Sequence, residues 1–576
     1  MRNTSSFFMQ KGMERMANTY KGITTATKTT DINEDDYVFI NQYDALKQIK
    51  KSELIKGETL NEKVDKETVR AILNKKPTVN SLSDFFELQA TTDVYQTKVW
   101  NSAYNPTPTC EKLGANAGLV CEPSTDTTEG QDDYADKIEF MWWYCNYEYD
   151  ANGNKIVTAI EGDANYSESG IVDVGVVGMT FYYKFDLSNS NYQLLSWSTA
   201  PNDSLNLVPY DYSVMHDGTI RPYYVISAFP SIKGTDGLLH SQPNGRMEVF
   251  QSHNNMITNY GKKGTNVTGA RASRQTFQYI FNLIKYGTKN SQSIYAGVTN
   301  WNFQYSAAVQ RTTKLTYFPV TASQAANLEV GCYVSVGYGV NNNGSVNNDR
   351  QNSTLHKYAN DVKILRIEDM DDGNKAVYLD IDTGFDTMPV ALTDTLNAPI
   401  IMSSMHMRTG ETKKVIGKHD GSAVSNTNGR HSYRVQGVEY ALGAYLIASD
   451  VVMVFKSDYS KDVYVAPRGV KHSTSESTIK STYKLIGNIP NSGNGSDFWI
   501  GDITVDEETG AFFPSTIISS SSQGMGDRVY AGGTATSGAR EYLQGGYLWV
   551  GGLAGVSCLD CWYGLSHAFW LFAAAD

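Results

Sequence analysis

Residues 545–576 read GGYLWVGGLAGVSCLDCWYGLSHAFWLFAAAD, a composition that separates them from the rest of the chain. Large aromatic residues are interleaved with glycine, alanine and serine, and Asp560 and His567 are the only acidic or basic residues before Asp576. Rigid aromatic side chains supply contact area at low entropic cost, and small neighbours allow the backbone to present them. This segment is therefore more typical of a recognition surface than of a reaction centre.

Two other interpretations of this segment compete. A membrane-spanning helix needs about 20 apolar residues, but six glycines interrupt the segment and no basic residues flank it. In the second interpretation, the segment forms core strands. This must be true of part of it, because a soluble monomer rarely exposes so many apolar rings. We therefore expect no membrane insertion, and a mixture of buried and exposed aromatic positions.

The composition of the whole chain narrows its class. A chain of 576 residues is longer than a single hydrophobic core usually organises, which predicts several domains. Only 19% of residues are charged, whereas tyrosine (37) and glycine (49) are abundant, which favours β-structure with long polar loops. The net charge of −12 disfavours nucleic-acid binding, which needs clustered lysine and arginine. No basic stretch followed by an apolar one opens the chain, so we predict no signal peptide and synthesis in the cytoplasm.

The N-terminal residues look separable from the rest of the chain. Residues 29–52 predict a hairpin with strands at 37–40 and 45–49, and residues 61–75 predict a short amphipathic helix. Several lysines in this region fit either a solvated helix face or a docking surface. We predict that residues 1–93 form a small attachment and oligomerisation module.

The remaining chain predicts an α+β, β-rich protein. Aromatic strands are expected within residues 138–149, 172–185 and 221–229, and a helix at 274–286, with Ser273 capping its start and Gly287 its end. Residues 315–394 predict a β-rich insertion, in which strands at 362–367 and 376–381 pair across an acidic hairpin turn. The insertion divides a large domain into residues 94–314 and 395–576, and a mobile loop is expected at residues 339–353.

Six scattered cysteines do not form the dense pattern of a disulfide framework, so free thiols are expected, with a Cys110–Cys121 bridge as an alternative. Cys558-Leu-Asp-Cys561 spells CxxC, which fits a redox pair or half of a zinc site. Because no second pair accompanies it, simple burial is the favoured interpretation. The prediction is a protein without metal or cofactor that is not an enzyme.

Four stretches resemble gut-phage structural proteins of the C-type-lectin fold, a family that includes targets of diversity-generating retroelements. They are TTDINEDDYVFINQYDALKQIKKSEL near the N-terminus, TFQYIFNLIKYGTKNSQSIYAG ending at Gly297, YRVQGVEYALG ending at Gly443, and residues 540–576. They occur in the order found in that family. The resemblance implies a C-type-lectin-like domain with a β insertion. Such a fold does not by itself imply sugar or calcium binding.

In that family the final segment is the exposed variable face. The resemblance therefore implies that glycines 545, 546, 551 and 555 with Ala554, Leu565, Trp570 and Ala574 form the scaffold. It also implies a ligand-binding set that consists of Tyr547, Trp549, Val550, Leu553, Leu559, Cys561, Trp562, Tyr563, His567, Phe569 and Leu571. Ala575 and Asp576 stand where arginine and leucine are common in the family.

The function expected on this basis is that of a phage adhesin in a tail or head fibre. It would bind a host-cell surface glycan or protein through the terminal segment, and other virion proteins through the N-terminal module. A homotrimer on the virion surface is expected, because such fibres are usually built that way. The alternatives are a capsid or tail decoration protein, an oxidase similar to formylglycine-generating enzymes, and a polysaccharide depolymerase with paired carboxylates.

Overall fold

The computed structural model describes residues 37–42, 45–50, 79–124, 130–339, 353–414, 428–491, 498–531, 535–569 and 571–576. About 36% of the structure is strand and 13% is helix, which confirms the prediction of a β-rich protein. The predicted helix at residues 61–75 and most of the loop predicted at 339–353 lie outside the described residues. None of the described helices is long and apolar enough to span a membrane.

The predicted N-terminal hairpin is present. Strands β1 (Tyr37–Gln42) and β2 (Ala45–Lys50) pair antiparallel, with Gln42 opposite Ala45 at the turn. Residues 1–79 with 136–138 form one compact unit and residues 80–135 with 139–576 form the other, so the first division falls after Val79, ahead of the boundary predicted at residue 93. The difference has a packing cause: in the second unit, Phe85 of α5 (Leu82–Phe86) is buried and its ring contacts Trp143 at 5.4 Å.

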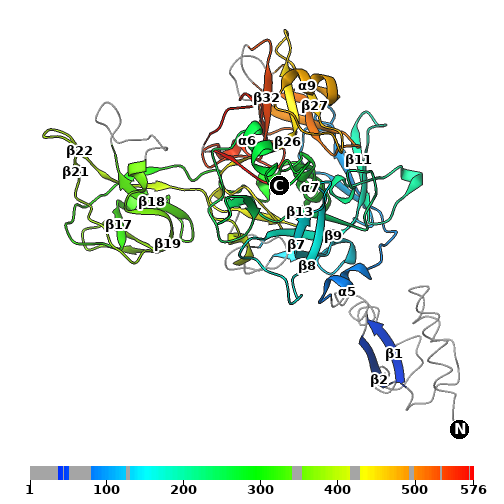
Figure 1. Cartoon of the computed structure of the whole chain (residues 1–576), viewed down its shortest axis with the longest axis horizontal. Coiled ribbons are helices and arrows are strands. Elements are labelled where there is room, and N and C mark those ends of the chain that lie inside the picture. Colours follow the sequence, from blue (N-terminus) through cyan, green and yellow to red (C-terminus); the bar gives the residue numbers. More distant parts are fainter. Residues whose placement is uncertain are drawn as a thin grey trace. The chain divides into compact units, whose positions relative to one another are not determined.

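Two antiparallel sheets form the first half of the second unit. The five-stranded sheet has the order β12 (Val208–Pro209), β10 (Tyr182–Asp186), β11 (Tyr192–Ser198), β3 (Tyr95–Trp100) and β4 (Glu111–Gly114). The four-stranded sheet has the order β13 (Tyr223–Ser227), β9 (Asp173–Met179), β7 (Trp142–Tyr149) and β8 (Lys155–Ile160), and Figure 1 shows its strands side by side. The sequence stretch 172–185, predicted as strand, therefore divides between both sheets, with the break at Thr180 and Phe181.

The predicted central helix is present as α7 (Ser273–Phe281), continued by one π-helical turn that ends at Gly287 with φ 62°. Gly287 caps it as predicted, but Ser273 does not cap its start. Ser273 is the first helical residue, and its hydroxyl donates to Asp211 Oδ2 at 2.8 Å. Phe281 packs against Phe181 (5.6 Å between ring centroids) and Trp197 (6.0 Å), which places α7 on the aromatic core of the five-stranded sheet.

A six-stranded antiparallel sheet contains the predicted insertion. Its order is β16 (Gln304–Ser306), β23 (Ile400–Ser404), β18 (Tyr333–Tyr338), β19 (Ala359–Asp369), β20 (Lys375–Leu379) and β17 (Tyr317–Val320). The hairpin β19–β20 and its acidic turn agree with the prediction. The sheet extends beyond residues 315–394 on both sides, because β16 and β23 pair with each other and β23 pairs with β18.

The last part of the chain builds a nine-stranded sheet. Its path is β28 (Lys484–Ile489), β27 (Lys461–Val465), β26 (Tyr445–Phe455), β32 (Ala539–Gln544), β33 (Leu559–Asp560), β31 (Arg528–Tyr530), β29 (Phe498–Val505) and β30 (Phe512–Ile518), with β34 (Phe572–Ala573) added parallel to β26. All eleven residues of β26 are buried, so this strand is the centre of the sheet. The other α-helices among the described residues are α6 (His253–Tyr260), α8 (Ala322–Ala325) and α9 (Glu476–Thr482).

The central role of β26 predicts a position-dependent loss of stability. Ile447 of β26 is fully buried, so Ile447→Ala should lower the free energy of unfolding by about 2–5 kcal/mol. Leu485 of β28 is 53% exposed, and Leu485→Ala should change it by less than about 0.5 kcal/mol. Urea denaturation of both variants measures the difference, and equal effects would contradict the assigned strand order.

Candidate functional site

The terminal segment is anchored by its backbone to at least four distant parts of the chain. Tyr445 N–H donates to Leu571 O at 2.8 Å, Ser231 N–H to Ala574 O at 2.9 Å, and Ala270 N–H to Ala575 O at 2.8 Å. Upstream, the N–H of Gly551 donates to Thr299 O at 2.6 Å. Because each bond saturates a buried or half-buried polar group, the segment holds one conformation rather than behaving as an independent loop.

At two of the predicted scaffold glycines, a larger residue is sterically excluded. A Cβ at Gly555 would lie 1.9 Å from Asp527 Oδ1, and a Cβ at Gly546 would lie 2.4 Å from that of Ala554. The Asp527 carboxylate approaches this closely because it accepts hydrogen bonds from the N–H (2.9 Å) and hydroxyl (2.6 Å) of Ser557. Ala554, Leu565 and Ala574 are buried, and Trp570 lies outside the described residues.

The structure separates the eleven predicted binding residues into three groups. Trp549 (59% exposed), Trp562 (41% exposed) and His567 face solvent. Four are half-buried: Tyr547, Leu553, Tyr563 and Phe569. Four are buried and contribute nothing to an exposed face: Val550, Leu559, Cys561 and Leu571.

The burial of these four residues corrects the predicted binding set, and for Leu559, Cys561 and Leu571 its cause is strand pairing. Leu559 lies in β33, which is enclosed between β31 and β32. The N–H of Cys561 donates to Tyr530 O at 3.0 Å, which continues the same pairing. Leu571 immediately precedes β34, against β26. In such short strands no long alternation of apolar and polar residues exists to show which side chain faces inward.

A cluster of rings remains accessible on this segment. We define the terminal aromatic surface as Tyr530, Trp562, Tyr563, His567 and Phe569. Tyr563 stacks on His567 at 4.6 Å and on Phe569 at 6.5 Å, and Trp562 lies 6.0 Å from Tyr530. Phe572 lies beneath three of these rings, 4.9 Å from Tyr563, 6.0 Å from His567 and 5.8 Å from Phe569, and is 1% exposed. Those three rings therefore rest on a fixed base.

Tyr530 was not predicted as a member of this surface. It reaches Trp562 because β31 pairs parallel with β33, with Tyr530 opposite Asp560. Parallel pairing between segments that are about thirty residues apart leaves no local signal in the sequence. Arg528 supports the cluster, since its guanidinium lies 5.1 Å from the ring of Tyr530 and 3.6 Å from Asp560 Oδ2.

The CxxC motif does not have the properties of a reactive pair. Cys558 and Cys561 are free and fully buried, and burial raises the pKa of each thiol to about 12. Reactive thiols have lowered pKa values and partial exposure. Cys110 and Cys121 are also free. Within the described residues there is no group of three or more His, Cys, Asp or Glu side chains arranged to hold a metal ion.

Comparison of the chain with models of protein families and with curated protein sequences finds no match. Inferences about function therefore depend on the residues and their arrangement.

Glu541 of β32 carries a buried carboxyl group next to this segment. Its side chain is fully buried and accepts the N–H of His253 at 3.3 Å, while its own N–H donates to Tyr563 O at 2.9 Å. Burial raises the pKa of Glu541 to about 9, far above the value of about 4.3 in an unfolded chain. Between these two values the folded state retains a proton that the unfolded state has lost.

The raised pKa predicts a pH-dependent effect of Glu541→Gln. The Glu541 contribution in the natural chain is fully present below about pH 4 and is lost as the pH rises toward about 9. Glutamine resembles the protonated form and does not titrate. At pH 8 the variant should therefore exceed the natural chain in unfolding free energy by more than about 1.4 kcal/mol, the equivalent of one pKa unit. At pH 4 the unfolding free energies of the variant and the natural chain should agree.

Denaturant unfolding at both pH values measures this difference. Glu476→Gln is the matched control, because Glu476 forms an exposed ion pair with Lys480 on α9, and such pairs are worth about 0.3–0.5 kcal/mol. A Glu541→Gln variant that is equally stabilised at pH 4 and pH 8 would show that the carboxyl is ionised in the folded protein.

Proposed function

We propose that this chain is a phage virion adhesin that binds a host-cell surface glycan or protein through the terminal aromatic surface. The observation that carries the proposal is an exposed tryptophan, Trp562, which lies 6.0 Å from Tyr530 and directly precedes Tyr563, a ring that packs on the buried Phe572. Tryptophan and tyrosine dominate the binding energy of interfaces when they are rigidly held. Aromatic faces suit both sugars and protein loops.

We further propose that the second unit is a C-type-lectin-like domain with the six-stranded sheet as its insertion. Three of the four stretches on which the resemblance rests contact one another, which supports this assignment. Tyr295 stacks on Tyr433 at 4.1 Å, and the N–H of Val556 donates to Ser291 Oγ at 2.9 Å. Stretches far apart in the sequence thus meet in one core.

The N-terminal unit is proposed to attach the protein to other virion proteins, with a homotrimer as the functional form. Repetition of a binding site on a virion strengthens weak single contacts, because the second and third contacts become intramolecular. A surface made of a few partly exposed rings needs such multivalency to hold a cell.

The proposal predicts that Trp562→Ala weakens binding to host cells. Flow cytometry of the labelled protein on a panel of gut bacterial strains identifies a strain that binds. On that strain, loss of a ring worth about 2 kcal/mol should raise the apparent Kd about thirtyfold. Trp549→Ala, tested separately, shows whether the second exposed tryptophan belongs to the same surface.

Tyr104→Ala is the control, because Tyr104 is 58% exposed but lies in a different part of the chain. It should leave binding unchanged. Undiminished binding by folded Trp562→Ala would place the adhesive surface elsewhere. A virion structure in which these rings are buried against another subunit would favour the decoration protein instead.

A further inference from the structure

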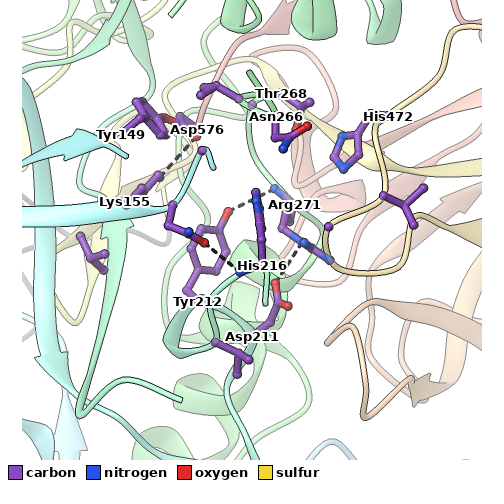
Figure 2. A pocket seen from close by; sticks show the side chains of 18 of the residues that line it. Tyr149, Lys155, Asp211, Tyr212, His216, Asn266, Thr268, Arg271, His472 and Asp576 are labelled. Carbon is purple, nitrogen blue, oxygen red and sulfur yellow. Dashed lines mark hydrogen bonds and ion pairs between the residues drawn. The ribbon is translucent and has the colours of Figure 1, made fainter. Parts of the chain in front are cut away.

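A cavity of about 90 Å³ lies elsewhere in the second unit and shares no lining residue with the terminal aromatic surface. Figure 2 shows that its walls come from the start of β8, the segment around Asp211, the segment around Arg271, the segment around His472, and Asp576. Its floor is buried, whereas Asn266, Gly469 and Lys471 at its rim are exposed. The cavity is therefore open to solvent on one side.

The floor of this cavity presents buried polar atoms that form no hydrogen bond with described residues. They include Lys155 Nζ and His472 Nδ1, whose residues are only 8% and 7% exposed. Tyr149 OH and Arg271 Nη2 are two further buried atoms that form no hydrogen bond with described residues. Leaving a buried donor without a partner costs about 1–3 kcal/mol, and more for a charged group. Groups in this situation are usually completed by a ligand or by ordered solvent.

Positive charge exceeds negative charge around the cavity. Four cationic side chains line it, Lys155, Arg221, Arg271 and Lys471, against the carboxylates of Asp211 and Asp576. Arg271 Nε is paired with Asp211 Oδ2 at 3.0 Å and with Asp450 Oδ2 at 3.4 Å. Asp211 in turn accepts from Arg468 at 2.8 Å. These contacts balance the charge of Arg271, although its Nη2 atom and the Nε atom of Arg221 form no hydrogen bond with described residues. Lys155 is the most buried of the four basic side chains, and its partners among the described residues are also incomplete.

Lys155 has a carboxylate on one side and aromatic rings on the others. Its Nζ lies 3.3 Å from Asp576 Oδ1, as drawn in Figure 2, and lies over the rings of Tyr147 (4.7 Å) and Tyr212 (5.3 Å). Burial lowers the pKa of Lys155 well below its usual value and raises the pKa of Asp576 to about 7. In its charged form this group has three donors, and an anion in the cavity would supply the acceptors that stabilise that form.

We propose that this cavity binds one small oxyanion through Lys155, Tyr149, His472 and Arg271. The chemical class is a carboxylate, phosphate or sulfate, either free or as the acidic substituent of a saccharide held at the open rim. The volume is several times the ~10–15 Å³ that one water needs, which suits a group of this size. This site shares no residue with the terminal aromatic surface, so an experiment can refute the anion-site proposal without refuting the adhesin proposal, and the reverse.

Isothermal titration calorimetry of the full chain with sodium sulfate, sodium phosphate and glucuronate, at constant ionic strength set with chloride, tests the proposal. We expect saturable binding of one anion per chain by at least one of the three, and none of glucose. Tighter binding of glucuronate than of both inorganic ions would identify an acidic saccharide, and the reverse would identify a free anion. No saturable binding of any of the three would overturn the proposal.

Lys155→Met keeps the aliphatic stem and removes the charge, and it should weaken binding at least tenfold. Lys289→Met is the matched control, because Lys289 is also buried (2% exposed) but donates to Trp100 O outside this cavity. Equal affinity in folded Lys155→Met would overturn the proposal. If that variant does not fold, a selenate soak of the natural chain decides: an anomalous peak within hydrogen-bond distance of Lys155 Nζ supports the site, and its absence refutes it.

Discussion

The structure of the second unit depends on the hydrogen bonds made by the buried polar side chains of α7. All nine residues of this helix are buried, including Arg274, Gln275 and Gln278. Gln275 Nε2 donates to Val556 O, and Gln278 Nε2 donates to Tyr433 OH. The guanidinium of Arg274 lies 4.8 Å from the ring of Tyr440, whose hydroxyl donates to Arg274 O at 2.9 Å. Because buried polar groups without partners are costly, these bonds specify how the terminal segment and residues 433–440 meet the helix.

This arrangement explains why an apparent recognition segment is mostly scaffold. Backbone bonds from residues 231, 270 and 445 hold its last residues in the interior, and only a minority of its side chains remain accessible. Glycine at position 555 allows the backbone to pass the carboxylate of Asp527. A rigid base and a few exposed rings are the properties that a binding surface needs, since little entropy is lost when rings that are already fixed engage a ligand.

The two candidate sites differ in how far the sequence reveals them. The aromatic composition of residues 545–576 shows where a surface lies, and four of its five rings, Trp562, Tyr563, His567 and Phe569, were in the predicted set. The burial of Leu559 and Cys561 and the inclusion of Tyr530 were not predicted, because parallel pairing of β31 with β33 is a long-range event. The anion cavity has no sequence signal, since its lining residues come from segments between residues 149 and 576.

By itself, the sequence determined the local structure: the β-rich class, the N-terminal hairpin, the helix ending at Gly287, and the hairpin β19–β20. These elements arise from periodicity and from turn or capping residues, which act over a few positions. Only the tertiary structure decided which residues of the terminal segment face solvent, where the six-stranded sheet ends, and which polar side chains line the cavity around Lys155. Those properties depend on contacts between residues that are tens to hundreds of positions apart, and a side chain's neighbours in the sequence do not specify its neighbours in space.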